Sequence, residues 1–276
     1  MVRLSYPAAL ARMVSSIAAV FLWSNLAVAH SPPVTPRLQI QGGLLLLHAG
    51  DGTVLRGQAL KGTVVTLRDR SGRPFELRID AAEAGPSADI ELYDAVVRWR
   101  ADDPWQPLCR PGPDGHARLL AIESAPNQSD NNESGLPVSF ACTAGAKGKC
   151  IMRGYRPWAT SAAGVPLAPY FEACIRMMRA DYCGDGQSNT VEGVRIESWD
   201  NLGIRTAKPS LPLESAWSAT GAVCVARSRV PSLATLATIV NRCPHLAPRV
   251  RQDCSDVSGE PGGDALLWNS SEPVER

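Results

Sequence analysis

Acids, small hydroxyl residues and glycines are concentrated in residues 181–193. Asp181, Asp185 and Glu192 follow the 1, 5 and 12 spacing of a calcium-binding loop, in which carboxylate oxygens surround a hard cation. Cys183 at the third position, and a strand-like segment after the loop, argue against a true EF-hand. A calcium site formed by these three acids is therefore one hypothesis for this segment.

A structural role for the same segment is the favoured alternative. Gly184 and Gly186 permit positive φ angles, and Asp181 and Asp185 can cap exposed backbone N–H groups. Cys183 would then fix the end of the preceding helix through a disulfide bond. We expect this arrangement in preference to a metal site.

Carboxylates of the segment Asp181–Asp200 suggest a second chemistry, because two acids at a suitable separation catalyse glycoside hydrolysis. The sequence does not give that separation, and acids beside glycines are usually turn formers. The chain contains no Gly-x-Ser-x-Gly elbow, His-Glu-x-x-His helix, Walker loop or Gly-x-Gly-x-x-Gly turn. A secreted hydrolase that uses these acids, with or without calcium, is therefore the alternative function and not the favoured one.

Histidine chemistry has little support in the sequence. The four histidines, none of which has a second histidine at metal-binding spacing, are His30, His48, His116 and His245. If a leader is cleaved after Ala29, His30 becomes the N-terminus, where its amine and imidazole could chelate copper beside a second histidine. The Ser31-Pro32-Pro33 segment that follows is typical of a loose tail, which argues against such a site.

Rigid aromatic side chains are the candidates for ligand contact. Trp158 follows Gly154-Tyr155-Arg156-Pro157 and could stack on a sugar or clamp a peptide. Tyr155 and Trp158 are therefore our candidate ligand-binding residues. Core packing is the expectation for most other tryptophans, because Trp199 and Trp217 occur in patterns typical of buried strands.

The first 29 residues resemble a signal peptide. Arg3 and Arg12 precede a short apolar stretch that ends in Ala27-Val28-Ala29, an A-x-A cleavage site. The stretch is too short to span a bilayer comfortably, so we expect export, cleavage and no stable membrane span afterwards. The 276-residue chain has a formal charge of +1, which argues against nucleic acid as the main partner.

An even number of cysteines in an exported chain indicates disulfide bonds. No Cys-x-x-Cys pair suggests a metal site. Sequence proximity alone suggests that Cys142 pairs with Cys150 and Cys243 with Cys254. The eight disulfide candidates are Cys109, Cys142, Cys150, Cys174, Cys183, Cys224, Cys243 and Cys254.

The sequence pattern of residues 30–123 predicts a β-rich region. Apolar and polar residues alternate over 63–67 and over 75–79, with turn residues between them, which predicts a hairpin with one buried face. Two further strand-like segments follow at 90–93 and 96–99, so we expect a small barrel or sandwich. Residues 124–137 have one leucine and are otherwise small or polar, and they predict a surface loop.

The remainder of the chain mixes helix and strand. Helical spacing of apolar residues predicts a helix over 168–180, and residues 194–199 alternate like a strand. A second helix is expected from Ser232, a suitable N-cap, to Cys243, where Pro244 stops it. The fold class is therefore α+β, with a β-rich N-terminal region and a disulfide-linked helix, loop and strand after it.

Several blocks of sequence resemble one family. Ala180-Asp181-Tyr182-Cys183, followed by Gly184-Asp185-Gly186, is similar to the signature of the ADYC-domain family of exported bacterial proteins. Further similar blocks, which extend the resemblance over roughly residues 100 to 230, are WQPLC (105–109), GYRPW (154–158), Ala216-Trp217 and GAVC (221–224). The resemblance implies residues 138–230 as the ADYC-like region, and the residue pattern predicts a C-terminal helix with a cysteine-containing tail over 231–276. It implies no activity.

These observations together favour an exported, disulfide-stabilised protein of the periplasm or extracellular space. The missing catalytic motifs and the number of cysteines indicate a non-enzymatic binding or structural module with an unknown envelope or extracellular ligand. No cofactor is expected unless the calcium site is real.

Overall fold

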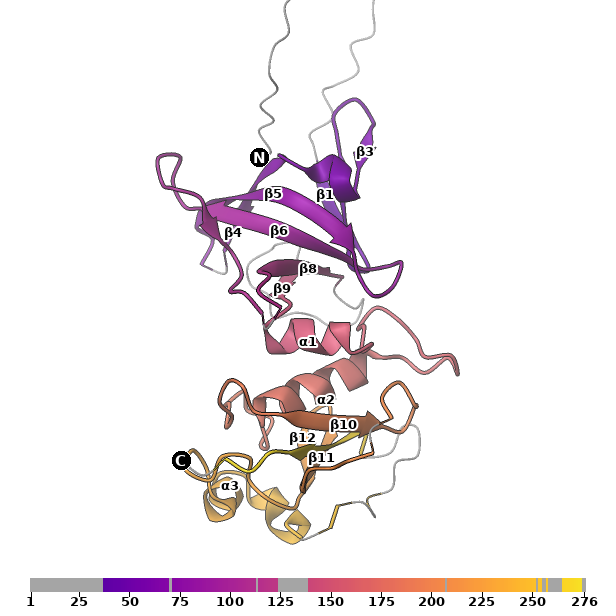
Figure 1. Cartoon of the computed structure of the whole chain (residues 1–276), viewed down its shortest axis with the longest axis vertical. Helices are drawn as coiled ribbons and strands as arrows, with labels where there is room; N and C mark the ends of the chain where they lie inside the picture. The colour runs from indigo at the N-terminus through magenta and orange to yellow at the C-terminus, as the bar shows by residue number, and fades with distance from the viewer. Residues whose placement is uncertain are drawn as a thin grey trace, which may run out of the picture.

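The computed structural model describes residues 37–69, 71–112, 114–123, 139–206, 208–251, 253–254, 257 and 265–274. The predicted leader 1–29, His30 and the predicted polar loop 124–137 lie outside these residues. The described chain forms an upper half rich in strands and a lower half in which helices pack on another sheet (Figure 1). This mixture agrees with the α+β prediction.

Two antiparallel sheets build the upper half. One has the strand order β1-β2-β3, and the other has the order β4-β5-β6-β8-β9, with β7 paired to β6. A short 3-10 helix spans Gly57–Leu60. The strands are β1 (Arg37–Gln41), β2 (Leu44–His48), β3 (Val54–Leu55), β4 (Val64–Arg68), β5 (Pro74–Ala84), β6 (Glu91–Arg98), β7 (Gln106–Pro107), β8 (Arg118–Ile122) and β9 (Ser139–Cys142).

The hairpin predicted from residues 63–67 and 75–79 is confirmed by β4 and β5. Asp69 closes the turn between them, because its Oδ1 accepts hydrogen bonds from the backbone N–H groups of Ser71 and Arg73, both at 2.9 Å. Such a turn is the usual reason for an aspartate at this position. The local sequence thus fixes the register of the hairpin.

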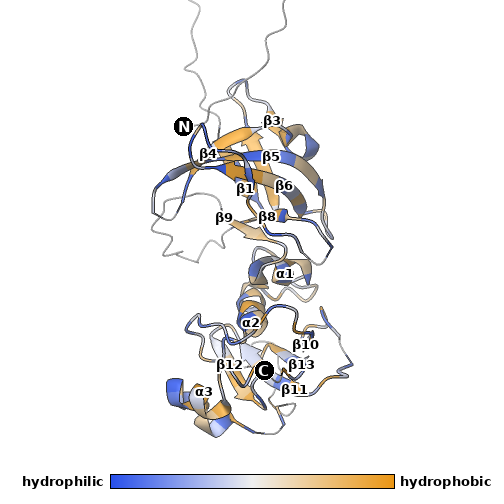
Figure 2. Cartoon of the chain, turned by 60° about the vertical axis from the view of Figure 1, so that its left-hand side comes forward, coloured by the Kyte–Doolittle hydropathy of each residue, from blue (hydrophilic) through white to orange (hydrophobic). Residues whose placement is uncertain are grey.

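One apolar cluster lies between the two upper sheets. Leu77 and Ile79 of β5 are buried in it together with Leu45 and Leu47 of β2. Figure 2 shows both hydrophobic and hydrophilic stretches along the strands of the upper half. The two segments predicted at 90–93 and 96–99 belong to the single strand β6. The more specific assignment of this half to a barrel or a sandwich stays a prediction.

The lower half contains three α-helices and a four-stranded sheet within the described residues. The sheet has the order β10-β13-β11-β12, and helix α2 contacts its strands β11, β12 and β13. The elements are α1 (Ala146–Met152), α2 (Ala168–Arg179), β10 (Ile196–Asp200), β11 (Leu213–Ser218), β12 (Gly221–Val225), α3 (Leu236–Arg242), the 3-10 helix Pro244–Arg249 and β13 (Leu267–Ser271).

Helix α2 confirms the helix predicted at 168–180. Phe171 and Ile175 are buried on one side, as the helical spacing requires. The helix ends at Arg179 because Ala180 adopts a left-handed conformation, with φ at 48°. A left-handed residue at this point is a common helix terminator.

The second predicted helix begins later than expected. We expected the N-terminal cap at Ser232, but α3 starts at Leu236. Thr235 is the cap instead, because its Oγ1 accepts a hydrogen bond from the Thr238 N–H at 3.1 Å. The helix ends before Pro244, as predicted.

Strand β13 has no counterpart among the predicted elements. It lies between β10 and β11 in the middle of the lower sheet. All five of its residues are buried, including Asn269, Ser270 and Ser271. Polar residues in a fully buried strand break the alternating pattern, which explains why periodicity does not indicate this strand.

The segment Gly154–Trp158 joins the two halves. Trp158 Nε1 donates a hydrogen bond to Asp89 Oδ2 at 2.7 Å, and Arg156 Nη1 forms an ion pair with Asp89 Oδ1 at 2.5 Å. The main apolar cluster of the lower half also includes Ile90 and Leu120 from the upper sheet. The two halves therefore share packed and polar contacts.

All eight cysteines are paired, but both pairings suggested by sequence proximity are wrong. The four disulfides are Cys109–Cys142, Cys150–Cys174, Cys183–Cys243 and Cys224–Cys254. Cys150 lies in α1 and faces Cys174 of α2, so helix packing and not sequence distance selects its partner. Within the described ranges, no helix has the length and apolar character needed to cross a membrane.

Candidate functional site

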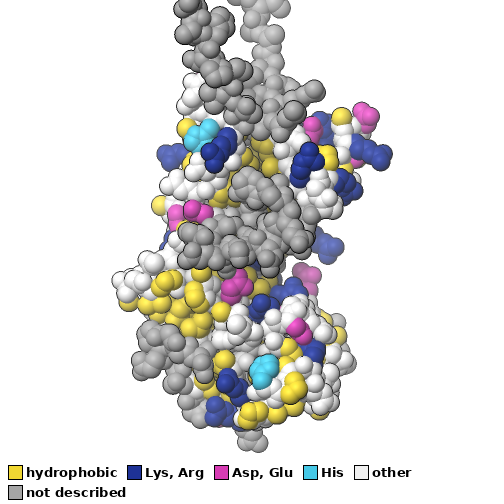
Figure 3. Space-filling model, turned by 180° about the vertical axis from the view of Figure 1, so that it is seen from behind, with side chains coloured by type: hydrophobic (Ala, Val, Ile, Leu, Met, Phe, Trp, Pro, Cys, Tyr) yellow, Lys and Arg dark blue, Asp and Glu magenta, His cyan; other side chains and the backbone are white. Residues whose placement is uncertain are grey.

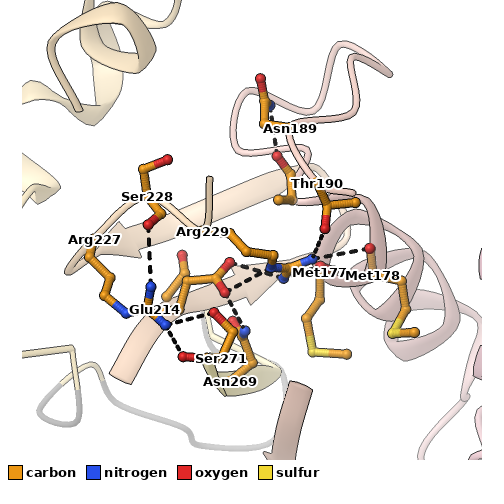
Figure 4. A network of polar contacts seen from close by, with 12 residues as sticks. Met177, Met178, Asn189, Thr190, Glu214, Arg227, Ser228, Arg229, Asn269 and Ser271 are labelled. Carbon is orange, nitrogen blue, oxygen red and sulfur yellow. Dashed lines mark hydrogen bonds and ion pairs between the residues drawn. The ribbon is translucent and has the colours of Figure 1, made fainter. Parts of the chain in front are cut away.

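A buried ion pair lies in the lower half, between strand β11 and the segment after β12. The side chains of Glu214 and Arg229 are both 0% exposed. Arg229 Nε lies 2.9 Å from Glu214 Oε2, and Nη2 lies 2.9 Å from Oε1, so the contact is bidentate (Figure 4). Charges removed from water in this way require further hydrogen bonds to compensate for their lost hydration.

Those further bonds come from the C-terminal end of α2 and from the loop after it. Arg229 Nη2 donates to the Met177 carbonyl at 2.7 Å, and Nη1 donates to the Met178 carbonyl at 3.1 Å and to Thr190 Oγ1 at 3.3 Å. The last carbonyls of a helix lack partners within the helix and attract a cation. Arg229 therefore satisfies the end of α2 and neutralises Glu214 at the same time.

Glu214 also accepts hydrogen bonds from two neighbouring elements. Asn269 Nδ2 of β13 donates to Oε2 at 2.9 Å, and the Tyr182 hydroxyl donates to Oε1 at 3.2 Å. Trp217 Nε1 donates in turn to Asn269 Oδ1 at 2.7 Å. Helix α2, the loop after it and three segments of the sheet region thus meet at this ion pair.

The first two residues of the Ala180-Asp181-Tyr182-Cys183 tetrapeptide end the helix and fix the loop. Asp181 is 0% exposed, and its Oδ2 lies 2.6 Å from Arg176 Nη1 and accepts the Gly186 N–H at 3.0 Å. This carboxylate caps the loop, as the structural alternative predicted.

The last two residues of the tetrapeptide connect the loop to the core. The Tyr182 ring stacks on Trp217 with 5.4 Å between ring centres, and its hydroxyl accepts the Arg229 N–H at 2.9 Å. Cys183 is cross-linked to Cys243 at the C-terminal end of α3. The whole tetrapeptide is therefore part of the framework of the lower half.

Two glycines of this loop provide a matched test of that packing. Gly184 and Gly186 both have positive φ angles, 73° and 86°. A Cβ atom on Gly184 would overlap the Thr220 carbonyl, whereas a Cβ atom on Gly186 would meet no atom within 4 Å. We expect Gly186→Ala to cost about 1–2 kcal/mol for the left-handed backbone, and Gly184→Ala to cost clearly more. Urea unfolding of the two variants measures the difference, and equal losses would contradict the close approach.

The three proposed calcium ligands occupy different environments. Asp181 is buried against Arg176, while Asp185 Oδ2 lies 3.3 Å from Arg242 Nε. Glu192 is exposed. Across the ranges that the structure describes, no three His, Cys, Asp or Glu side chains are grouped closely enough to hold a metal ion. The calcium site stays a prediction.

Calcium titration tests that site directly. Because arginines already neutralise Asp181 and Asp185, we expect millimolar calcium to leave the midpoint of thermal unfolding unchanged relative to magnesium. A specific site would add RT ln(1 + [L]/Kd), about 2.7 kcal/mol at one hundred times Kd. Differential scanning fluorimetry would contradict this expectation by showing a rise that calcium produces, magnesium does not, and Glu192→Gln removes.

Asp200, the remaining acid of the predicted hydrolase segment, holds the turn after β10. Its Oδ1 accepts the N–H groups of Leu202 and Ile204 at 2.8 and 3.1 Å. Its Oδ2 accepts the Arg205 N–H and the Tyr155 hydroxyl, both at 2.7 Å. These four hydrogen bonds hold the carboxylate at the turn and use both of its oxygens.

The two predicted ligand-binding aromatics have internal partners. Tyr155 is 0% exposed, and its ring lies 6.5 Å from that of Tyr170. Trp158 is partly buried and donates its indole N–H to Asp89. Their role in ligand binding stays a prediction, and their observed role is to connect neighbouring elements.

The family model of the ADYC domain matches residues 57–231, which is more than half of the chain. The chain belongs to the ADYC-domain family. No curated protein and no solved structure matches it. The match begins earlier than the resemblance recognised from residue 100, so the ADYC domain includes the β4 and β5 hairpin as well as the loop of the tetrapeptide.

Three residues of the buried network have no place among the sequence predictions. They are Glu214, Arg229 and Asn269, which come from β11, the segment after β12, and β13. The one sequence signal is Glu214 itself, a charged residue inside an otherwise strand-like segment that contains Trp217. A charge in such a place indicates a buried partner but does not identify it.

The tyrosines of the ADYC domain give a pH prediction. Burial raises the pKa of Tyr93, Tyr155, Tyr170 and Tyr182, and the charges of Asp200 and Glu214 raise the pKa of Tyr155 and Tyr182 further. Unfolded tyrosines ionise with a pKa of about 10. Since the folded pKa values are higher, the unfolded chain loses these protons first, and stability should be full below about pH 10 and fall above it.

Ultraviolet absorbance of tyrosinate, recorded together with near-ultraviolet circular dichroism, measures this behaviour. We expect tyrosinate absorbance from these four residues to rise only as the dichroism of the folded state is lost. In protein without the leader, and therefore without Tyr6, a reversible rise near pH 10 while the folded spectrum is kept would contradict the burial of the four hydroxyls.

Proposed function

We propose that this ADYC-domain protein is an exported binding or structural module without catalytic activity. The observation that carries this proposal is that three acids of the lower half, two of them from the predicted hydrolase segment, are held inside the framework. Glu214 is paired with buried Arg229, Asp181 caps a loop, and Asp200 accepts four hydrogen bonds. A general acid or base must reach the substrate, and these three acids are directed toward the protein.

Export is supported by the leader pattern and by the disulfides. Four cross-links form and persist in an oxidising compartment such as the periplasm or the extracellular space. The basic residues, apolar stretch and A-x-A site of residues 1–29 have the pattern of a signal peptide, which would direct the chain to such a compartment. The proposed partner is a molecule of the envelope or the extracellular space.

The charge distribution supports a partner other than nucleic acid. Figure 3 shows basic and acidic side chains scattered over the described surface of one face, without a continuous basic stripe. The formal charge of +1 for the chain agrees with this mixture. Nucleic-acid binding usually needs a concentrated positive field.

Asparagine substitutions separate a framework role from catalysis. We expect Asp181→Asn and Asp200→Asn to lower the urea midpoint, because each removes a charge that holds several donors. Asp185→Asn, at a side chain that is 41% exposed, is the matched control with a smaller loss. Nitrophenyl glycosides and fluorescent casein should give no turnover with any of these proteins. Turnover by the wild type that these substitutions abolish without changing the midpoint would favour the hydrolase.

Mass spectrometry tests export. The full-length chain is produced in a Gram-negative host, and the protein released by osmotic shock is weighed before and after reduction. We expect a chain that begins at His30 and gains eight hydrogens on reduction, two for each of four disulfides. An intact leader together with eight free thiols would overturn the proposed compartment.

A further inference from the structure

One of the four disulfides combines a partly exposed cysteine with a neighbouring cation. Cys183 is partly exposed, whereas its partner Cys243 is 4% exposed. Arg242 Nε donates to Cys183 Sγ at 3.2 Å and lies 3.3 Å from Asp185 Oδ2. The more accessible sulfur of this cross-link is therefore the one that has a guanidinium beside it.

The guanidinium of Arg242 also holds an unused donor. Its Nη2 is buried and has no hydrogen-bond partner among the described residues. A disulfide sulfur is a weak acceptor, whereas a thiolate at Cys183 would carry a full negative charge and would strengthen the bond from Nε. Arg242 is thus placed to stabilise the reduced form of Cys183 more than the oxidised form.

The other three disulfides lack one of these two features. Arg251 Nε lies 3.4 Å from Cys224 Sγ, so that bond has a cation beside it but no access from solvent. Cys142 is partly exposed, but its Sγ lies 4.0 Å from the Leu108 carbonyl, an acceptor that favours a thiol over a thiolate. The cysteines that are 0% exposed are Cys150, Cys174, Cys224 and Cys254.

We propose that the Cys183–Cys243 disulfide is a site of thiol–disulfide exchange, which a dithiol reductant opens while the other three cross-links stay closed. A thiolate attacks a disulfide at a sulfur that it can reach, and a positive charge there attracts the thiolate and stabilises the sulfur that later leaves. Cys183 meets both requirements. This exchange goes beyond the proposed binding or structural role and does not depend on the absence of catalysis.

The reaction has two steps. In the first, a thiolate of the reductant attacks Cys183 Sγ, a mixed disulfide forms there, and Cys243 leaves as a thiolate that takes a proton from water. In the second, the other thiol of the reductant, once deprotonated, attacks the reductant's own sulfur in the mixed disulfide. Cys183 then leaves as a thiolate beside Arg242. Two electrons pass from the dithiol to the protein, and the reductant becomes a disulfide.

Opening of this bond would act on helix α3. The bond attaches the C-terminal end of α3 to the loop of the tetrapeptide. The N-terminal end of the same helix, with Thr235 and Leu236, lines a cavity of about 500 Å³ together with Pro231 and Val274. Reduction would therefore free one wall of a cavity whose size is typical of small-molecule sites.

Selective reduction tests the proposal. The folded, fully oxidised protein is treated with limiting dithiothreitol, free thiols are alkylated with iodoacetamide, and peptide mass spectrometry locates the label. We expect Cys183 and Cys243 to be labelled first, and hydrogen exchange to become faster in α3 while α2 stays protected. Labelling of another pair first, of all eight cysteines together, or of none before the protein unfolds would overturn the proposal.

Arg242→Gln separates assistance of exchange from a structural role. We expect it to slow the reduction of Cys183–Cys243 about tenfold, because the leaving thiolate loses one charged hydrogen-bonding group. An arginine with only a structural role would give the opposite result, since its loss would loosen α3 and speed reduction. Arg242→Lys should retain part of the rate because it keeps the charge. Unchanged or faster reduction of Arg242→Gln would contradict the role of this guanidinium.

Arg251→Gln is the matched control, because Arg251 also donates to a disulfide sulfur but at a buried cysteine. It should leave the reduction rate of Cys183–Cys243 unchanged. Glutathione, which has a single thiol, identifies the sulfur that is attacked: we expect its mixed disulfide at Cys183 and alkylation at Cys243. The reverse assignment would overturn the proposed direction of attack. Failure here would leave the framework role unchanged, because the asparagine series tests that role in the oxidised protein.

Discussion

Glu214→Gln should lower the free energy of unfolding by about 3–5 kcal/mol, because it leaves the Arg229 guanidinium charged and buried without its counter-charge. The amide keeps the size of the side chain, so the loss reports charge and hydrogen bonding and not a cavity. It also removes one acceptor from Asn269 or Tyr182. This loss is a large part of the 5–15 kcal/mol typical of a folded domain. Equilibrium urea unfolding, followed by tryptophan fluorescence, measures it.

Two further variants show whether burial of the charge is the cause. Arg195→Gln removes an arginine that is 63% exposed from its ion pair with Glu197, and we expect it to cost less than about 1 kcal/mol. Glu214→Leu combined with Arg229→Met removes both buried charges and should restore part of the stability that Glu214→Gln loses. A loss of the same size in Glu214→Gln and Arg195→Gln would contradict the importance of the buried pair.

Removing the Cys183–Cys243 disulfide should lower the free energy of unfolding by about 4 kcal/mol. The two cysteines are 60 residues apart, and a cross-link that closes so long a loop strongly restricts the unfolded chain. The bond also attaches α3 to the loop of the tetrapeptide, so Cys183→Ala with Cys243→Ala should release that helix. Urea unfolding gives the loss, and hydrogen exchange of the α3 amides shows where it occurs.

The single variant Cys183→Ala separates the bond from the side chains. It already breaks the cross-link, so we expect it to lose about as much stability as the double variant. A loss confined to the double variant would show that the packing of Cys243, which is 4% exposed, carries the effect. That result would contradict the proposed role of the cross-link.

Local patterns predicted the elements whose determinants lie close together in the sequence. The β4 and β5 hairpin depends on alternation and on one aspartate in its turn, and α2 depends on a stripe of apolar residues. In both cases the residues that decide the structure lie within the element itself. Residue type alone did not locate the cap of α3. Ser232 and Thr235 are equally suitable residue types, and only the observed hydrogen bond identifies Thr235 as the cap.

Long-range relations could not be predicted in the same way. The partner of Cys150 is set by the packing of α1 on α2, and Glu214 meets Asn269 through the insertion of β13 beside β11. Nothing in the spacing of these residues records that insertion. The loop 181–193 was recognised as unusual, and the prediction that Asp181 and Asp185 cap backbone N–H groups is confirmed by their bonds to Gly186 and Gln187.

Strand β13 comes after β12 in the chain yet lies between β10 and β11, so the lower sheet is incomplete until that strand has arrived. During synthesis, β10 and β11 cannot form their hydrogen bonds with β13 until the residues between them and β13 have been made. All strands of the upper half precede residue 143, so its sheets can form before the lower half has been synthesised. The lower sheet therefore closes only after residues 267–271 have been synthesised, and a chain shortened before them would leave β10 and β11 without the strand that pairs with both.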